Sequence, residues 1–140
     1  MTALFQLHPR LVADFHGLGR RGAVHLLLQR NAILPWFIAV PEAEALELFD
    51  LAPTLRRELD DFTDALARFV KTRYVCDKIN IAAIGNIVPQ LHVHVIGRRR
   101  DDCCWPQAAW GHVSGAEVYS SEALAALVRD LRAEFDLRET

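Results

Sequence analysis

The chain has 140 residues, 51% of them hydrophobic and 24% charged, which is the length and composition of one ordinary globular domain. A net charge of −2 argues against a nucleic-acid partner, and no apolar run is long enough to cross a membrane. Because the first residues lack the basic start and apolar core of a signal peptide, we expect a cytoplasmic protein with a single domain over residues 1–140.

The three cysteines give no sign of a disulfide framework or a structural zinc site. Cys76, Cys103 and Cys104 are odd in number, two of them are adjacent, and no Cys-x-x-Cys spacing occurs. We therefore expect free thiols that serve as small packing residues in a reducing compartment.

The first predicted elements are a short helix and a hairpin. The segment "HPRLVADFHGLG" (8–19) has a proline at a possible first helical position and glycines at its end. Residues 23–30 and 35–41 are apolar runs rich in β-forming and aromatic residues, with a short turn at 31–34 between them. This order favours an antiparallel hairpin.

A long amphipathic helix is predicted over residues 51–72, because apolar side chains there recur at steps of three and four. They are Leu55, Leu59, Phe62, Leu66, Phe69 and Val70. Strands follow at 78–85 and 90–97, and Ser120 or Ser121 is placed to cap a final helix. The order of elements predicts an α+β domain, with an antiparallel sheet and the helices on one of its faces.

The segment "PQLHVHVIGRRRDD" (89–102) reads as a buried strand that carries two histidines. Strand side chains alternate, so Gln90, His92 and His94 are expected on one face and the valines on the core face, against the long helix. The following arginine run is expected to be a solvated loop. Trp105 and Trp110, further along, are expected to be packing anchors.

Three interpretations of the two histidines compete. They can be hydrogen-bonded structural residues on a half-exposed face, or two of the three ligands that a zinc ion needs, with His25 or His112 as the third. They can also serve nucleophilic catalysis, because a neutral imidazole attacks phosphorus and a neighbouring donor stabilises the charge that develops on its oxygens.

The residues resemble a known family. "QLHVHVIGR" is similar to the His-φ-His-φ-His-φ-φ signature of the histidine triad (HIT) superfamily, where φ is apolar. With "NIAAIGNIVPQLHVHVIGR" (80–98), "PWFIAVP" (35–41) and "WPQAAWG" (105–111), the resemblance to bacterial HIT-domain proteins extends over about residues 5–112. It implies a HIT-like antiparallel sheet of about five strands, with one long helix and shorter helices packed on it.

The resemblance also implies roles for the motif residues. His92 matches the nucleophile, which forms a covalent nucleotidyl-histidine, and His94 matches the residue that contacts the α-phosphate oxygens. Gln90 replaces the first histidine, near the leaving group. Because glutamine is neutral, it cannot supply a proton as a general acid, so we expect Gln90 to limit which leaving groups can be released.

Further residues are expected to bind the nucleotide. Asn80 and Asn86 match amides that hold phosphate in related proteins, and Val88 and Pro89 shape the loop that faces it. Asn31 stands where the family has an aspartate that contacts the ribose, and it lacks the carboxylate's charge. A second group is expected to face the base: Phe5, Leu26 and Leu28.

The implied function is that of a nucleotide hydrolase or nucleotidyl transferase that cleaves at the α-phosphate of a dinucleoside polyphosphate or phosphoramidate. The resemblance implies a nucleotide substrate, a homodimer, and neither a metal ion nor another cofactor. Two alternatives stay open. One is a nucleotide-binding regulatory module with little turnover, favoured by Gln90 and Asn31, and the other is a metal-binding protein that uses His92 and His94.

Overall fold

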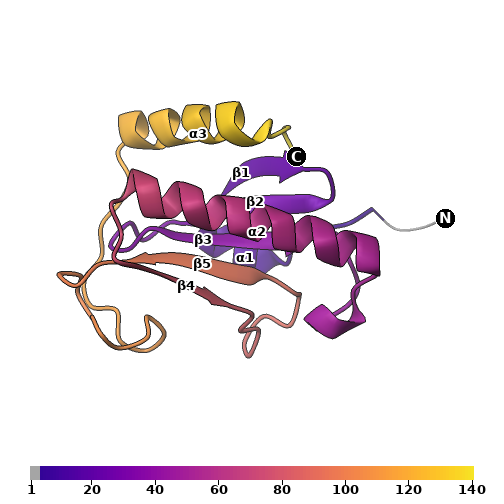
Figure 1. Ribbon diagram of the computed structural model, residues 1–140, viewed down its shortest axis with the longest axis horizontal. Helices are drawn as coiled ribbons and strands as arrows, with labels where there is room; N and C mark the ends of the chain where they lie inside the picture. The colour runs from indigo at the N-terminus through magenta and orange to yellow at the C-terminus, as the bar shows by residue number, and fades with distance from the viewer. Residues whose placement is uncertain (1–3) are drawn as a thin grey trace.

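The computed structural model describes residues 4–140, which form a five-stranded sheet with helices packed against it (Figure 1). The elements in chain order are α1 (Pro9–Asp14), β1 (Phe15–Arg21), β2 (Val24–Gln29), β3 (Trp36–Pro41), the 3₁₀ turn η1 (Leu48–Asp50), α2 (Pro53–Arg73), β4 (Lys78–Ala82), β5 (Val93–Arg98) and α3 (Ser121–Phe135). The strands lie in the order β1-β2-β3-β5-β4, and all neighbours are antiparallel. The expected α+β fold with about five strands is confirmed.

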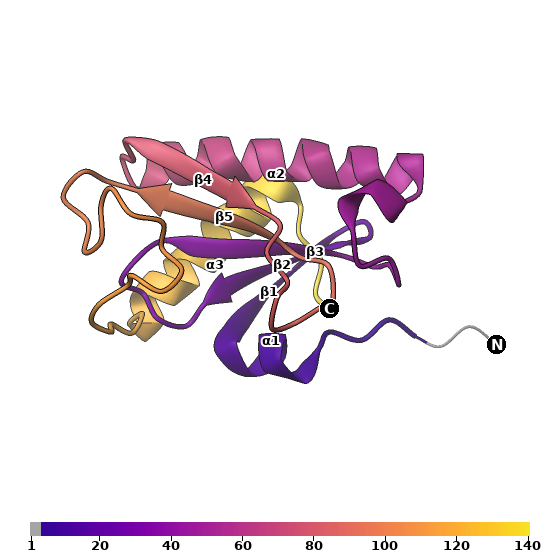
Figure 2. The same ribbon diagram turned by 90° about the horizontal axis from the view of Figure 1, so that it is seen from below.

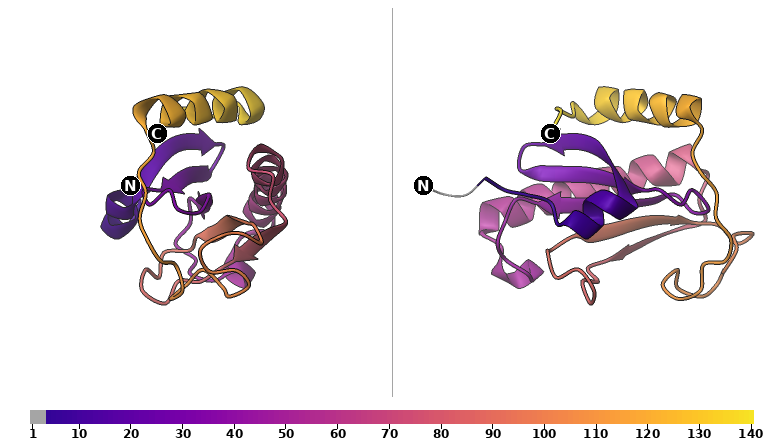
Figure 3. Two further views of the ribbon diagram at one scale, coloured as in Figure 1. Left: turned by 90° about the vertical axis from the view of Figure 1, so that its left-hand side faces the viewer. Right: turned by 180° about the vertical axis from the view of Figure 1, so that it is seen from behind.

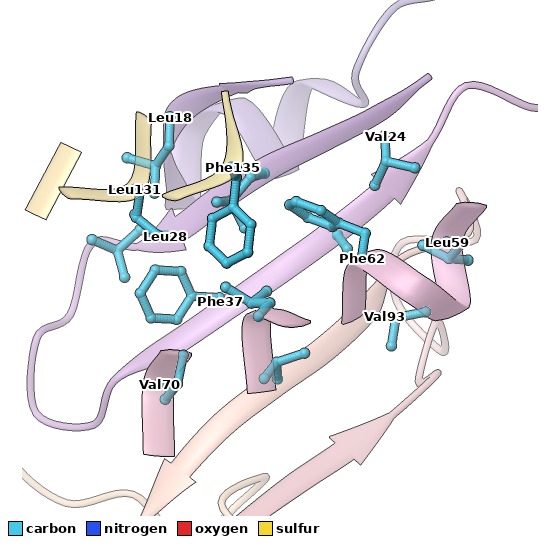
Figure 4. Close-up of a cluster of buried hydrophobic side chains, with 14 of the residues drawn as sticks. Leu18, Val24, Leu28, Phe37, Leu59, Phe62, Val70, Val93, Leu131 and Phe135 are labelled. Atoms are coloured by element: carbon cyan, nitrogen blue, oxygen red, sulfur yellow. The ribbon is translucent and has the colours of Figure 1, made fainter. Parts of the chain in front are cut away.

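The long helix α2 forms where the three- and four-residue spacing predicts it. Pro53 occupies its first turn, where a missing backbone N–H costs no hydrogen bond. Leu59, Phe62, Leu66 and Val70 are buried along one stripe of the helix, which packs on β3 and β5 (Figure 4). Burying each such side chain contributes about 1.5–3 kcal/mol to the free energy of folding, so this stripe holds the helix on the sheet.

The two longer helices lie on the same side of the curved sheet (Figure 3). The Ser120 hydroxyl caps α3 by accepting a hydrogen bond from the N–H of Ala123, as predicted. The ring of Phe135 in α3 meets that of Phe62 in α2 at 5.5 Å. Figure 2 views the other side of the sheet, where the loops after β4 and β5 cross in front of the strands. No helix within residues 4–140 has the length and apolar character needed to cross a membrane.

The segment after α1 differs from the prediction. The helix stops at Asp14, and residues 15–21 form strand β1, with a bulge between Gly17 and Gly19. Gly19 has a φ of +125°, and a Cβ there would lie 2.6 Å from the carbonyl oxygen of Arg138. The glycines therefore serve a bulge and the close approach of the C-terminal residues, which pair with Arg20, and they do not end a helix.

The short helix α1 does not share a face with α2 and α3. Its buried Leu11 belongs to a second hydrophobic cluster on the opposite face, together with Trp36 and Ile38 of β3. The expectation that all helices gather on one face is therefore wrong for α1. That second face is the one on which the histidines lie.

Candidate active site

β5 separates the core from the candidate site. Val93 and Val95 belong to the cluster beneath α2, whereas His94 pairs with Ile38 across the ladder and lies on the opposite face. β5 begins at Val93, so His92 lies immediately before the strand, and the two imidazole rings are 4.7 Å apart. The predicted division into a valine face and a histidine face is confirmed for these residues.

His92 is buried and has one ring nitrogen fixed. Its Nδ1 lies 2.6 Å from the carbonyl oxygen of Gln90. Because a carbonyl only accepts, Nδ1 carries the proton and Nε2 keeps its lone pair. Burial lowers the pKa of His92 below its usual value, and the bond to the Gln90 carbonyl only partly offsets this shift. The ring is therefore neutral at pH 7, the state that a nucleophile needs.

A cleft of about 180 Å³ lies beside His92. Its walls include three residues of the β4–β5 loop and two that follow β3: Gly85, Asn86, Pro89, Leu46 and Glu47. Larger hollows lie along α3, but neither is lined by a histidine.

The loop that lines this cleft folds back closely on itself. A Cβ on Gly85 would lie 2.9 Å from the carbonyl oxygen of Val88, so the position requires glycine. Val88 is buried in the cluster around Trp36, while Asn86 and Pro89 are exposed. Three of the residues expected to bind the nucleotide thus belong to one loop, in which Val88 anchors the turn and the other two line the cleft.

His94 is held at both ring nitrogens. The indole Nε1–H of Trp36 donates to Nδ1 at 2.9 Å, and Nε2 lies 3.2 Å from the carbonyl oxygen of Ile84. Burial, reinforced by the neighbouring His92, lowers the pKa of His94 to about 4. The ring is therefore neutral, with its proton on Nε2. Trp110 packs edge-on against it, with ring centres 5.0 Å apart.

Gln90 lies before β5, and its side chain is engaged by the N-terminal segment. Its Oε1 accepts from the N–H of His8 at 2.8 Å, and its Nε2 donates to the carbonyl of Gln6 at 2.9 Å. Both polar atoms thus hold a segment more than eighty residues away in the chain. The strand alternation that predicts a shared face with His92 does not reach Gln90, because the strand starts three residues later.

Asn80 is held by a buried ion pair. Its Oδ1 accepts from Arg98, which is 2% exposed and forms a salt bridge of 2.8 Å with Asp102. Burial by itself would raise the pKa of Asp102, but hydrogen bonds from Arg98 and from backbone N–H groups lower it to about 2. The prediction of a solvated arginine loop is therefore wrong for Arg98, although Arg99 and Asp101 are exposed.

Asn31 lies after β2 and is engaged by the segment that precedes α3. Its Nδ2 donates to the carbonyl of Gly115 at 3.3 Å, and its Oδ1 accepts from the N–H groups of Ile33 and Glu117. The side chain that was expected to contact a ribose thus holds the chain between residues 115 and 118 against the end of β2.

The expected base-facing residues divide between the two faces. Leu26 and Leu28 lie in the core beneath α2 and α3, so the expectation that they face a base is wrong. Alternation along β2 instead places Leu27 on the histidine face. Phe5 does lie on that face, with its ring 5.2 Å from the ring of His25.

Trp36, for which the sequence predicted no functional role, contacts His94 directly. A buried tryptophan N–H needs a hydrogen-bond acceptor. The position of Trp36 in a predicted buried strand could therefore have indicated a polar partner for its indole. Trp105 and Trp110 are packing residues, as predicted, against Arg98 and against the Trp36–His94 pair. Within the described part of the chain, no three His, Cys, Asp or Glu side chains are grouped to hold a metal ion.

Comparison with known proteins gives consistent matches. A family model described as the HIT domain matches residues 11–101. A histidine triad protein from Bradyrhizobium japonicum is 34% identical, with a TM-score of 0.87 over 94% of this chain and 98% of that one. One from Marinobacter aquaeolei VT8 is 35% identical, with a TM-score of 0.87 over 96% and 98%. One from Sinorhizobium meliloti 1021 is 37% identical, with a TM-score of 0.86 over 93% and 96%.

A comparison with curated proteins finds no match. The family model nevertheless covers more than half of the chain, and the three solved relatives exceed 30% identity over nearly its whole length. Together with the paired histidines on the sheet face, these matches establish that the chain belongs to the HIT domain family.

Proposed function

We propose that this protein is a nucleotide hydrolase or nucleotidyl transferase that cleaves a dinucleoside polyphosphate or a nucleoside phosphoramidate at the α-phosphate. Membership of the HIT domain family supports nucleotide binding and hydrolase or transferase activity in general. The observation that carries the finer proposal is the state of His92. This ring is neutral, lies beside a cleft, and has its proton directed to the Gln90 carbonyl, which leaves the Nε2 lone pair available.

The proposed reaction has two displacements. Nε2 of His92 attacks the α-phosphorus and forms a P–N bond, while the bond to the leaving group breaks and the leaving atom keeps the electron pair. The Gln90 carbonyl stabilises the imidazolium through Nδ1–H. Water then attacks the phosphorus, the P–N bond breaks, its electron pair returns to Nε2, and the proton from water passes to solvent. The Nε2–H of His94 stabilises the charge on the phosphate oxygens.

The kind of leaving group that can be released depends on whether a side chain of the site can protonate it. Gln90 is neutral and has both polar atoms engaged, and His94 has its pKa lowered to about 4. Neither is set to protonate a leaving atom. A polyphosphate leaves readily without a proton, whereas an alkylamine does not. We therefore expect dinucleoside polyphosphates to be turned over faster than alkyl phosphoramidates.

One experiment tests this proposal. The protein is incubated with diadenosine tetraphosphate or with an adenosine alkyl phosphoramidate, with and without a chelator. AMP is quantified, and an adenylyl adduct is sought by mass spectrometry after rapid acid quench. We expect AMP release that is insensitive to the chelator, with an adduct on His92. The variant His92→Ala should bind nucleotide but release no AMP. Full turnover by this variant would contradict the proposal.

A second candidate function rests on Gln90 and Asn31. Gln90 cannot supply a proton to a leaving group, and the amide of Asn31 is engaged within the protein and lacks the charge of the family's aspartate. Slow release of the leaving group supports a nucleotide-binding module with little turnover. Tight binding of adenosine nucleotides with no AMP release, in the same experiment, would favour it.

We also propose a homodimer that acts in the cytoplasm without a cofactor. β4 pairs with β5 on one side only and lies at the edge of the sheet, where Ile81 is half exposed. Such an edge favours pairing with a second copy. The three cysteines are free thiols, which suits a reducing compartment.

A further inference from the structure

The indole of Trp36 and the carbonyl of Ile84 favour the same tautomer of His94. An indole N–H can only donate, so the His94 Nδ1 that lies 2.9 Å from it must accept. The Ile84 carbonyl can only accept, so the Nε2 that lies 3.2 Å from it must donate. The two contacts agree, and both rings are almost fully buried, which keeps water from competing for Nδ1.

We infer that Trp36 is a positioning residue for the reaction, because it fixes His94 as the Nε2–H tautomer that can donate to a phosphate oxygen. The inference rests on the proposed function. In the opposite tautomer, Nε2 would present a lone pair to the developing negative charge and would repel it. Hydrogen bonding at the far nitrogen is the usual device that sets which nitrogen of a histidine faces its partner.

The two contacts of His94 differ in a way that suits this role. The Trp36 bond, at 2.9 Å, is of ordinary length, whereas the Ile84 contact, at 3.2 Å, is at the long end of the range for N–H···O bonds. A charged phosphate oxygen is a stronger acceptor than a carbonyl. Substrate can therefore take the Nε2–H from Ile84 while Trp36 keeps the ring in place.

Trp110 provides a matched control. It packs edge-on against both Trp36 and His94, with ring centres 5.2 Å and 5.0 Å away. Within residues 4–140, however, His94 receives its indole hydrogen bond from Trp36 alone. Trp110→Phe thus removes a comparable indole from the same cluster and leaves the hydrogen bond intact.

Two substitutions at position 36 separate the N–H from the ring. Trp36→Phe keeps an aromatic ring but has no donor. Trp36→His keeps a five-membered ring in which Nε2 occupies the same place relative to Cγ as the indole Nε1, so it can restore the donor. The first readout is a long-range ¹H–¹⁵N correlation spectrum of the ligand-free, histidine-labelled protein at pH 7. It reports which His94 nitrogen is protonated without any need for turnover.

We expect His94 to be protonated on Nε2 in the wild type, in Trp110→Phe and in Trp36→His. In Trp36→Phe the Ile84 carbonyl holds this tautomer alone, through the longer contact, so a population protonated on Nδ1 should become measurable. With diadenosine tetraphosphate, kcat should fall by roughly tenfold in Trp36→Phe with little change in KM, and Trp36→His should recover most of it. A wild-type His94 protonated on Nδ1 overturns the inference whatever the activity, as does a Trp36→Phe variant that keeps both tautomer and kcat. Absence of turnover in the wild type contradicts the proposed function, while the spectrum still decides the tautomer.

Discussion

Among single residues, burial lowers the pKa of both histidines of the site. The pKa of His92 is lowered by burial, and that of His94 is lowered to about 4 by burial and by the neighbouring His92. Both rings are therefore neutral in the folded protein at pH 7. One keeps a free lone pair on Nε2, and the other keeps an N–H there, because their Nδ1 atoms meet an acceptor and a donor respectively.

The lowered pKa of His94 predicts how stability depends on pH. The unfolded chain takes up a proton on His94 near pH 6.5, whereas the folded protein does so only near pH 4. Between these values the unfolded state binds more protons, so the free energy of unfolding falls as the pH falls through this window and is fully restored above it. Between pH 7 and pH 5, His94 should lower the free energy of unfolding by about 2 kcal/mol, as measured by urea denaturation.

The variant His94→Gln isolates this contribution, because glutamine does not titrate in that range. Its free energy of unfolding should fall less between pH 7 and pH 5 than that of the wild type, by about the same 2 kcal/mol. Equal losses in the two proteins would show that His94 is not the group responsible.

Because the ion pair of Arg98 and Asp102 is buried, replacing one of its charges should strongly reduce the free energy of unfolding. Asp102→Asn removes the charge that Arg98 needs while keeping the shape of the side chain. Because Arg98 is 2% exposed, its charge would be left buried and uncompensated. We expect the free energy of unfolding to drop by about 3–5 kcal/mol, as measured by denaturant titration.

The neighbouring pair of Arg99 and Asp101 is the control, since it lies in the same loop and is exposed to solvent. Asp101→Asn should leave the denaturation midpoint almost unchanged, because water and salt screen an exposed pair. Similar destabilisation by both substitutions would mean that burial is not what distinguishes the two pairs.

At the scale of elements, the N-terminal segment depends on Gln90. The glutamine holds residues 6 and 8 by two hydrogen bonds, and His8 in turn caps α1 by accepting from the N–H of Arg10. The segment also carries Phe5 onto the ring of His25. Gln90 therefore holds residues 5–8 over the histidine face.

Removing this attachment should loosen the segment without unfolding the sheet. In Gln90→Ala, hydrogen exchange at the His8 amide should be about thirtyfold faster, since the two lost hydrogen bonds are together worth about 2 kcal/mol. The amide exchange of the strands should not change. Gln107→Ala, at an exposed glutamine, is the matched control and should leave His8 protected. Unchanged protection of His8 in Gln90→Ala would rule out the attachment.

At the scale of the whole molecule, the open edge of the sheet predicts how copies of the chain associate. If the proposed homodimer pairs β4 with β4, Ile81→Lys should shift the molar mass measured by light scattering from that of a dimer to that of a monomer. Val118→Lys alters another exposed apolar residue, away from β4, and should leave the dimer intact. A monomeric wild type, or a dimeric Ile81→Lys, would contradict this arrangement.

Much of the fold could be read from the sequence because its signals are periodic and local. Both longer helices form where predicted, because their signals involve only residues close together in the chain. These signals are the four apolar residues on one stripe of α2 and the serine that precedes α3. β1 was missed because its glycines resemble a helix end. They are needed instead for a bulge against β2 and for contact with Arg138, more than a hundred residues away.

The family resemblance, the two longer helices and the face shared by His92 and His94 could be predicted from the sequence, because the motif and the alternation of side chains are properties of neighbouring residues. The partner of each polar side chain, by contrast, depends on the folded structure. Gln90 holds the N-terminal segment, Asn31 holds the segment before α3, and Trp36 donates to His94. Each of these contacts joins residues at least 58 positions apart, and the partner that a buried polar atom finds at such a distance is set by the packing of the whole sheet.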